Sequence, residues 1–288
     1  MFKGVLEART KYSFTDLLSK VSIDACIRRG LKRYPKDSSF RISRIDEHHV
    51  VKYGPDVDLH EAETMRLIAA STSIPVPTVH RAWKENQTTY ILMDYVHGIP
   101  LDAAWAGMSQ RTKDFVIDQL KAYVDEFRKL PCPLGDGAVC SAVGGYLRDN
   151  GRCGSETFGP YSTCDEFHHF VHGQRTLDDI RMFLGTEELV EFHSRPFPRS
   201  RFTHGDLAPR NIMVDGAGTG KIVAILDWDA SGWFPEYWEY IKAKLMTRMP
   251  LEWDLRIKEF VGDYEAEWKA DGVVRKFCGL DLDGDRRQ

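Results

Sequence analysis

The chain has 288 residues, which is enough for one large domain or for two lobes with a shared core. It is 42% hydrophobic and 28% charged and contains 7 Trp, 15 Phe and 11 Tyr, a composition that is typical of globular proteins and excludes disorder. A formal net charge of −4 and the lack of a long basic run argue against nucleic acid as the main partner.

The first third of the chain predicts a small lobe that is rich in β-strands. Most of the first 35 residues have helical character, and Pro35 ends this segment. Strand-like runs on either side of the polar turn IDEHH predict a hairpin, and the prolines of IPVP stop the helix that precedes them. In chain order, we expect a hairpin over 38–54, a helix over 58–71 and two strands over 78–83 and 88–96.

The rest of the chain predicts a mostly helical lobe. Its first helix has apolar residues at helical spacing, and the segment after this helix is rich in Gly, Pro and Cys and looks irregular. A short apolar run later in the chain predicts a buried strand. In order, we expect a helix over 109–130, an irregular segment over 131–165, helix over 176–194, a strand over 222–227 and helix from Tyr237 onward.

The compartment that the sequence favours is the cytoplasm. The N-terminus has no apolar core of signal-peptide length, and no stretch approaches the about 20 apolar residues of a membrane span. Four of the six cysteines, Cys132, Cys140, Cys153 and Cys164, lie close together and raise the possibility of a zinc site. Because their spacings contain no C-x-x-C pair, we expect reduced thiols that bind no metal.

The glycine-rich GAGTGK at 216–221 looks like a nucleotide-binding loop. A P-loop requires G-x-x-x-x-G-K-[ST] between a strand and a helix. Here Gly216 and Gly220 enclose only three residues, Lys221 is followed by Ile222, and a strand comes next. Since the glycines lie between the apolar runs NIMV and IVAIL, we expect a hairpin turn instead.

A second set of residues suits phosphoryl transfer better. This chemistry needs a carboxylate that accepts or orients the proton of the attacking hydroxyl, and oxygen ligands for magnesium. The run HGDLAPRN places Asp206 and Asn211 five residues apart on a loop, and the glycine hairpin returns the chain to Asp227 at the end of a strand. Each residue alone is common in loops. Together, two carboxylates and an amide oxygen at this spacing predict a catalytic site.

The chain resembles the aminoglycoside phosphotransferase and choline kinase-like enzymes, small-molecule relatives of the protein kinases, in a branch abundant in fungi. The motifs that carry the resemblance are VVKYG at 50–54, EAETMR and SIPVP within 61–77, YILMDYVHG at 90–98, HGDLAPRNIMV at 204–214 and ILDWDASGWFPEYWEY at 225–240. The resemblance implies an α+β, bilobal protein-kinase-like fold with a small antiparallel sheet in the N-lobe and a mainly helical C-lobe. It also implies a nucleotide-binding N-lobe over 1–95 and a C-lobe over 96–288, with a substrate-side insertion at 131–200.

The resemblance also assigns residues to the nucleotide. Lys52 looks like the lysine that contacts the α- and β-phosphates, and Glu63 stands at the family's distance for its acidic partner, with Glu61 as the alternative. A glycine-rich loop over the phosphates is not present in KDSSFRIS, so Ser38 and Ser39 are expected to supply hydroxyl or amide contacts instead.

The hinge motif of the family is similar to LMDYV at 92–96. Met93 is expected beside the adenine, and the backbone of Asp94 and Val96 is expected to form hydrogen bonds to its edge.

The catalytic roles follow in the same way. Asp206 resembles the catalytic aspartate, and Asn211 and Asp227 resemble the metal ligands. His204 is expected to brace the catalytic loop without being the proton acceptor. Asp229 is expected to support the metal site from behind or to cap a turn.

We therefore expect an ATP- and Mg²⁺-dependent phosphotransferase that transfers the γ-phosphate to a hydroxyl of a small molecule. The alternatives are a catalytically silent nucleotide-binding or scaffold protein and a protein kinase. Only seven residues separate Asp227 from Pro235, which leaves no room for the activation segment of a protein kinase. The long segment 131–200 is expected to line the acceptor pocket. Asp165 and Glu166 are candidate polar contacts there, although a purely structural role is the favoured interpretation for both.

The sequence does not identify the acceptor. Trp228, Trp233 and Trp238 would suit an aromatic box for a choline-like cation, although aromatic residues at this density are more typical of a core.

Overall fold

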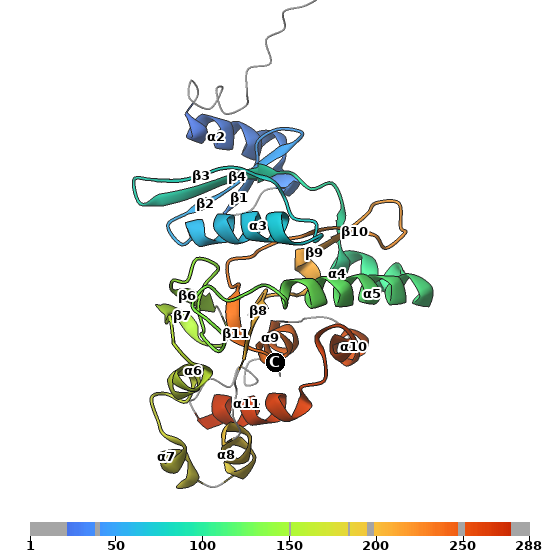
Figure 1. Ribbon diagram of the computed structural model, residues 1–288. Coiled ribbons are helices and arrows are strands. Elements are labelled where there is room, and N and C mark those ends of the chain that lie inside the picture. Colours follow the sequence, from blue (N-terminus) through green and yellow to red (C-terminus); the bar gives the residue numbers. More distant parts are fainter. Residues whose placement is uncertain are drawn as a thin grey trace, which may run out of the picture. The chain divides into compact units, whose positions relative to one another are not determined.

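The computed structural model describes residues 22–37, 41–149, 151–183, 185–194, 199–246 and 251–277. The described chain divides into two compact units (Figure 1). The first unit contains the described residues up to Leu59 together with Thr78–Tyr95, and the second contains His60–Pro77 and the described residues from Val96 onward.

The first unit is a four-stranded antiparallel sheet preceded by a helix (Figure 1). The hairpin and the two later strands predicted from the sequence are confirmed, and helix is confirmed for the described part of the N-terminal segment. The elements are α2 (Ile23–Arg33), the 3-10 turn η1 (Pro35–Asp37), β1 (Ile42–Arg44), β2 (His49–Gly54), β3 (Val79–Glu85) and β4 (Thr88–Asp94), with strand order β1-β2-β4-β3.

The two faces of this sheet carry different side chains. Ile27 of α2 packs with Val51 and Leu92, which are fully buried. Successive side chains of a strand point to opposite faces, so Lys52 lies on the face that Val51 does not occupy. Lys52 is paired with Ile91 and Val50 with Met93, which places the side chains of Lys52 and Met93 on the same face of the sheet.

The strands of the second unit form three small antiparallel groups. A three-stranded sheet has the order β10-β9-β5, and two further pairs are β11 with β8 and β6 with β7. The turn between β9 and β10 is closed by the Asp215 N–H, which donates to the Lys221 carbonyl over 2.9 Å, so the predicted glycine hairpin is confirmed. The strands are β5 (Ile99–Pro100), β6 (Leu147–Asp149), β7 (Gly154–Phe158), β8 (Ser200–Thr203), β9 (Ile212–Val214), β10 (Ile222–Ile225) and β11 (Gly232–Pro235).

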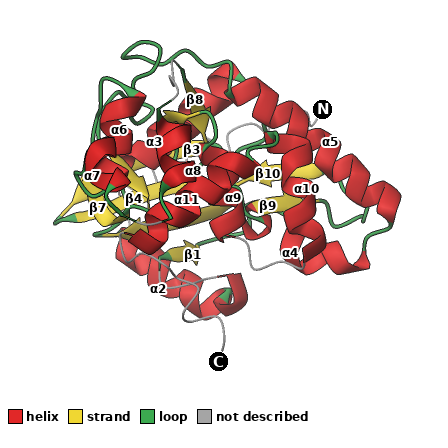
Figure 2. Ribbon diagram, turned by 90° about the horizontal axis from the view of Figure 1, so that it is seen from below, coloured by secondary structure: helices red, strands yellow, loops and turns green. Residues whose placement is uncertain are grey.

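Helices make up most of the regular secondary structure in the described part of the second unit (Figure 2). None of the helices in the described ranges is both long and apolar enough to cross a membrane. The helices are α3 (Leu59–Ser71), α4 (Leu101–Ala104), α5 (Gln110–Phe127), α6 (Cys164–Val171), α7 (Leu177–Arg181), α8 (Glu187–His193), α9 (Trp238–Met246), α10 (Leu251–Val261) and α11 (Glu265–Phe277), with 3-10 turns η2 (Trp105–Gly107) and η3 (Pro209–Asn211).

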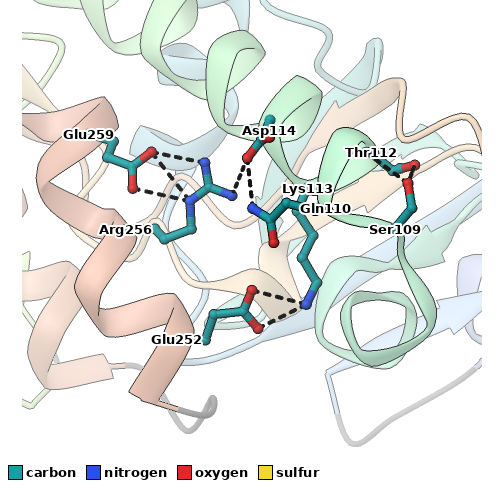
Figure 3. Close-up of polar contacts among 8 residues, drawn as sticks. All are labelled: Ser109, Gln110, Thr112, Lys113, Asp114, Glu252, Arg256 and Glu259. Carbon is teal, nitrogen blue, oxygen red and sulfur yellow. Dashed lines mark hydrogen bonds and ion pairs between the residues drawn. The ribbon is translucent and has the colours of Figure 1, made fainter.

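Helix α5 is fixed at its start and against α10. The Ser109 hydroxyl accepts a hydrogen bond from the Thr112 N–H and thus caps the helix. Lys113 forms an ion pair of 2.8 Å with Glu252, and Arg256 lies 2.8 Å from Asp114 (Figure 3). These contacts join α5 and α10 on their polar sides, while the apolar side of α5 is buried in the core.

Two predictions for the middle of the chain are wrong in detail. The segment 131–165 is not irregular throughout, because it contains the β6–β7 hairpin and the first residues of α6. Helix over 176–194 is interrupted between α7 and α8, where Gly185 has a φ of +78° and the Thr186 hydroxyl donates to the Ile180 and Phe183 carbonyls. Short strands and a glycine break carry little periodicity, so apolar spacing could not locate them.

The segment 131–200 is anchored to the C-terminal helices by buried ion pairs. The Asp149 carboxylate contacts the Lys242 ammonium and accepts a hydrogen bond of 3.2 Å from the Trp238 indole N–H. The Arg152 guanidinium donates to Asp271 over 2.7 Å, and both side chains are buried. Since removing one partner of a buried ion pair is strongly unfavourable, these contacts fix the segment to α9 and α11.

Candidate active site

The loop between β8 and β9 carries the HGD motif. Strand β8 pairs with β11, and the chain then turns at Gly205, whose φ is +78°. A side chain at Gly205 would clash with the carbonyl oxygen of Ala230, in the loop that follows Asp227. Glycine therefore allows the Gly205 loop and the Asp227 loop to approach each other backbone to backbone.

His204 braces this loop. Its Nδ1 accepts from the Asp206 N–H over 3.1 Å, and its Nε2 donates to the Leu226 carbonyl over 3.0 Å. Burial lowers the pKa of His204 to about 4, against the opposing charge of Asp227, so the ring is neutral at pH 7. Both ring nitrogens are used in these contacts, so His204 holds the backbone as expected from the sequence.

Glu239 is a residue of the site that the sequence analysis missed. It lies in the first turn of α9, is fully buried, and accepts the His204 N–H over 2.6 Å. Burial raises the pKa of Glu239 to about 7. The sequence feature that could have indicated Glu239 is its place in the aromatic run FPEYWEY. An acid that is buried among aromatic residues requires a hydrogen-bonding partner.

Asp206 lies at the centre of the site. One guanidinium nitrogen of Arg210 is 2.6 Å from each of its carboxylate oxygens, and the Asn211 amide donates to Oδ2 over 2.9 Å. Burial raises the pKa of Asp206, Arg210 opposes this shift, and the negative charge of Asp227 adds to it. Arg210 was not predicted as a site residue.

Asn211 and Asp227 are brought to the same place as Asp206. Asn211 ends the turn η3, and its carbonyl oxygen accepts the Leu226 N–H over 2.8 Å, which joins the loop that carries the HGD motif to the segment leading into Asp227. Asp227 has a φ of +66°, an uncommon conformation for a residue other than glycine and one that often marks functional sites.

The donor set of Asn211 and Asp227 suits magnesium. A carboxylate oxygen and an amide oxygen are hard ligands, and magnesium is bound by one or two protein groups together with substrate phosphates. The Asn211 amide nitrogen is turned toward Asp206, so its side-chain oxygen points to the other side of the amide. Within the described ranges, no group of three or more His, Cys, Asp and Glu is arranged to hold a metal by itself.

The segment after Asp227 attaches to α3. The Ser231 hydroxyl lies 3.2 Å from the Thr64 hydroxyl, and the Ser231 carbonyl accepts from His60 Nε2 over 3.0 Å. Helix α3 also carries Glu61 and Glu63. The position of this helix is therefore coupled to the loop that contains Asp227 and Asp229.

The two acidic candidates on α3 differ in their surroundings. Glu63 is exposed and lies 2.6 Å from Arg66, whereas Glu61 is only 2% exposed. A buried carboxylate needs a partner far more than an exposed one does. This difference weighs against the preference for Glu63 over Glu61 that spacing predicted.

The remaining nucleotide candidates belong mostly to the first unit. Lys52 and Met93 are buried on one face of its sheet, as described above. The Asp94 N–H donates to the Thr78 carbonyl over 3.1 Å, and the Asp94 carboxylate lies 2.6 Å from His80. Val96 is the first residue after this unit. Ser38 and Ser39 lie outside the described residues.

The three tryptophans of the possible aromatic box are core residues. Each is at most 2% exposed, and each indole N–H donates within the protein: Trp228 to the Ile225 carbonyl, Trp233 to the Leu130 carbonyl and Trp238 to Asp149. The ring of Trp228 also lies against His204, with 4.4 Å between the ring centroids. These contacts confirm the core interpretation.

Asp165 and Glu166 lie in the first turn of α6. The Glu166 carboxylate accepts the Ser162 N–H over 2.8 Å, and the Asp165 carboxylate is exposed and 3.9 Å from the His168 ring. Acidic side chains in the first turn stabilise a helix, so both have a structural role at this helix end.

The comparisons with known proteins identify the family of the chain. The model of the phosphotransferase enzyme family matches residues 40–272. The chain belongs to this family. A search of curated protein sequences gave no match for the phosphotransferase.

Solved structures show the fold of the phosphotransferase. The GDP complex of a mutant aminoglycoside 2′-phosphotransferase-IIIa is 15% identical and has a TM-score of 0.52, with 87% of this chain and 86% of that chain covered. A thermostable mutant of aminoglycoside phosphotransferase APH(4)-Ia, in a ternary complex with ADP and hygromycin B, is 14% identical with a TM-score of 0.51, covering 84% of this chain and 90% of that chain. The α+β, protein-kinase-like fold predicted from the motifs is thus confirmed.

Proposed function

We propose that this phosphotransferase transfers the γ-phosphate of ATP to a hydroxyl group of a small molecule in a Mg²⁺-dependent reaction. The observation that carries the proposal is the convergence of Asp206, Asn211 and Asp227, which lie on two loops joined by the hydrogen bond from the Leu226 N–H to the Asn211 carbonyl. This is the set of groups that phosphoryl transfer requires of a protein.

Asp206 is proposed to act on the acceptor hydroxyl. As the hydroxyl oxygen forms its bond to the γ-phosphorus, the bond from that phosphorus to the β,γ-bridging oxygen breaks and ADP leaves. The hydroxyl proton passes to the Asp206 carboxylate. Arg210 supports this role because its positive charge favours the ionised form of Asp206 in a buried site.

Asn211 and Asp227 would hold magnesium, which would neutralise charge on the phosphate oxygens when bound. Asp229 lies two residues further along the same loop, where it is proposed to support Asp227. The residues proposed to contact the nucleotide are Lys52, Glu61 or Glu63, Ser38, Ser39, Met93, Asp94 and Val96.

A small-molecule acceptor is supported by the chain after Asp227. Strand β11 begins at Gly232 and pairs with β8, so the chain is already part of the core five residues after the aspartate. A peptide-binding activation segment has no place here. The complexes of the solved relatives also favour a small acceptor, since one of them holds hygromycin B.

The test of this function is incubation of the purified protein with γ-³²P-labelled ATP and Mg²⁺, once with whole-cell protein and once with deproteinised cell extract. Label in a small metabolite, dependent on the protein, is the expected result. Label confined to protein bands would identify a protein kinase instead. Tight ATP binding with no label in either fraction would favour a catalytically silent nucleotide-binding protein.

The buried acid on α3 provides a separate prediction. Glu61→Gln is expected to lower kcat/KM for ATP by at least about tenfold, since a hydrogen bond to a charged group contributes about 1.5 to 3 kcal/mol. Glu63→Gln is the matched control on the exposed side of the same helix and should stay near wild type. Steady-state kinetics with varied ATP measure both. A larger loss of kcat/KM in the Glu63→Gln variant would instead favour Glu63 as the acidic partner, as the spacing predicted.

Arg210 should control the pH dependence of catalysis. Asp206 acts as a base only when ionised, so activity falls as the pH drops through its pKa. Arg210→Met removes the cation that opposes the effect of burial, which raises this pKa and should move the acidic limb of the kcat/KM profile upward by about 1 to 3 pH units. Arg210→Lys keeps a positive charge and should show a smaller shift. Identical profiles for all three proteins would contradict the assignment of Arg210.

A further inference from the structure

Two thiols meet at the start of the segment 131–200. The sulfur atoms of Cys132 and Cys140 are 3.6 Å apart. Two turns fold the chain between them: the Gly135 N–H donates to the Cys132 carbonyl, and the Ala138 N–H donates to the Gly135 carbonyl. Gly135 and Gly137 have φ values of +100° and +89°, a conformation that glycine adopts readily. The sequence between the two cysteines therefore folds them toward each other.

The two thiols differ in access. Cys140 is fully buried, and its backbone is held by two hydrogen bonds to Trp233 of β11, of 3.2 and 2.8 Å. Cys132 is partly exposed. An oxidant in solution can therefore reach the Cys132 thiol, whereas the Cys140 thiol is shielded from solvent and its backbone is fixed.

The surroundings of Cys132 also favour its thiolate. The contact with the Cys140 thiol lowers the pKa of Cys132, the Leu134 and Gly135 backbone adds to this shift, and burial of Cys132 opposes it. The same contact and burial raise the pKa of Cys140. The partly exposed sulfur is thus the more nucleophilic one at neutral pH.

We propose that Cys132 and Cys140 form a redox modification site, in which peroxides convert the pair to a reversible intramolecular disulfide. The geometry carries this proposal: a disulfide is about 2.05 Å long, so the two sulfur atoms, 3.6 Å apart, need to approach by only about 1.5 Å. The site is independent of the proposed phosphotransferase activity.

The chemistry balances in two steps. The Cys132 thiolate attacks one peroxide oxygen, the O–O bond breaks, and Cys132 becomes a sulfenic acid while the other oxygen leaves as water or an alcohol after protonation. The Cys140 sulfur then attacks the Cys132 sulfur, losing its proton, and the sulfenic oxygen leaves as water. The pair loses two electrons, which the peroxide accepts, and a dithiol reductant reverses the reaction by exchange.

The test is treatment of the full chain with hydrogen peroxide, followed by alkylation under denaturing conditions and peptide mass mapping. A cross-linked peptide pair containing Cys132 and Cys140, lost after dithiothreitol, is expected. In Cys140→Ser, dimedone should trap a sulfenic acid at Cys132, and in Cys132→Ser, Cys140 should stay alkylatable after peroxide.

Cys164 provides the matched control. It is buried, its thiol donates to the Gly137 carbonyl, and burial raises its pKa to about 12. In the native reduced protein, iodoacetamide should modify Cys132 at least about tenfold faster than Cys164. Cys164→Ser should form the same cross-link as wild type. A cross-link between other cysteines or between chains, or Cys132 and Cys140 both still alkylatable after peroxide, would overturn the proposal.

Discussion

Asp206→Asn is expected to lower kcat by about 10²- to 10⁴-fold, the range for loss of a general base. The substitution keeps the size of the side chain but removes the group that takes the proton of the acceptor hydroxyl. ATP binding should remain near wild type, because the residues proposed to hold the nucleotide are other ones. Turnover of labelled ATP with extract measures the first quantity, and isothermal titration calorimetry with ATP measures the second.

Asp118→Asn is the control for this prediction. Asp118 lies on the exposed side of α5 and should behave as wild type. Arg210 and Asn211 both donate to the Asp206 carboxylate. Asp206→Asn replaces one acceptor oxygen by an NH2 group, which then faces another donor. The melting temperature of this variant should therefore be recorded alongside its turnover. Unchanged turnover in a folded Asp206→Asn protein would remove Asp206 from the catalytic role.

The sequence predicted that Asp206, Asn211 and Asp227 lie close together because they are near one another along the chain and joined by a single hairpin. Asp206 and Asn211 are separated by five positions on one loop, and the glycine turn returns the chain by one antiparallel pairing to Asp227. A short loop and a tight hairpin leave few ways to place these three side chains relative to one another. The fold class followed from the same motifs together with the strand and helix patterns around them.

The parts that the sequence did not predict depend on contacts between distant residues. Glu239 reaches the His204 N–H from 35 positions away, and the burial that separates Glu61 from Glu63 depends on which side of α3 faces the core. The distance along the sequence favoured Glu63 and could not show which of the two acids is buried. Arg210 was adjacent to the motif, but its ion pair with Asp206 depends on how the turn η3 directs its side chain.

The segment 131–200 shows the same limit. The Gly-, Pro- and Cys-rich composition of residues 131–165 predicted an irregular segment and gave no sign of the β6–β7 hairpin. Asp149 and Arg152 find their partners in α9 and α11, 93 and 119 positions away. Cys132 and Cys140 were judged by their sequence spacing, which excludes a zinc motif and says nothing about the two turns that bring their sulfur atoms together.

The second large effect is expected at Asp227. Asp227→Ala should abolish Mg²⁺-dependent ATP turnover at every Mg²⁺ concentration, because it removes the only carboxylate in the proposed pair of metal ligands. Asp229→Ala should retain partial activity, since Asp229 is proposed to support the site without binding the metal. Turnover measured across a Mg²⁺ titration compares the two variants.

The backbone at Asp227 requires one further variant, because its φ of +66° disfavours alanine regardless of charge. Asn tolerates this conformation better than Ala, so Asp227→Asn separates loss of the charge from strain of the loop. We expect Asp227→Asn to melt near the wild-type temperature and still to lose nearly all turnover, with any residual activity requiring more Mg²⁺. The reverse ranking, with Asp229→Ala inactive and both Asp227 variants active, would move the metal site by two residues.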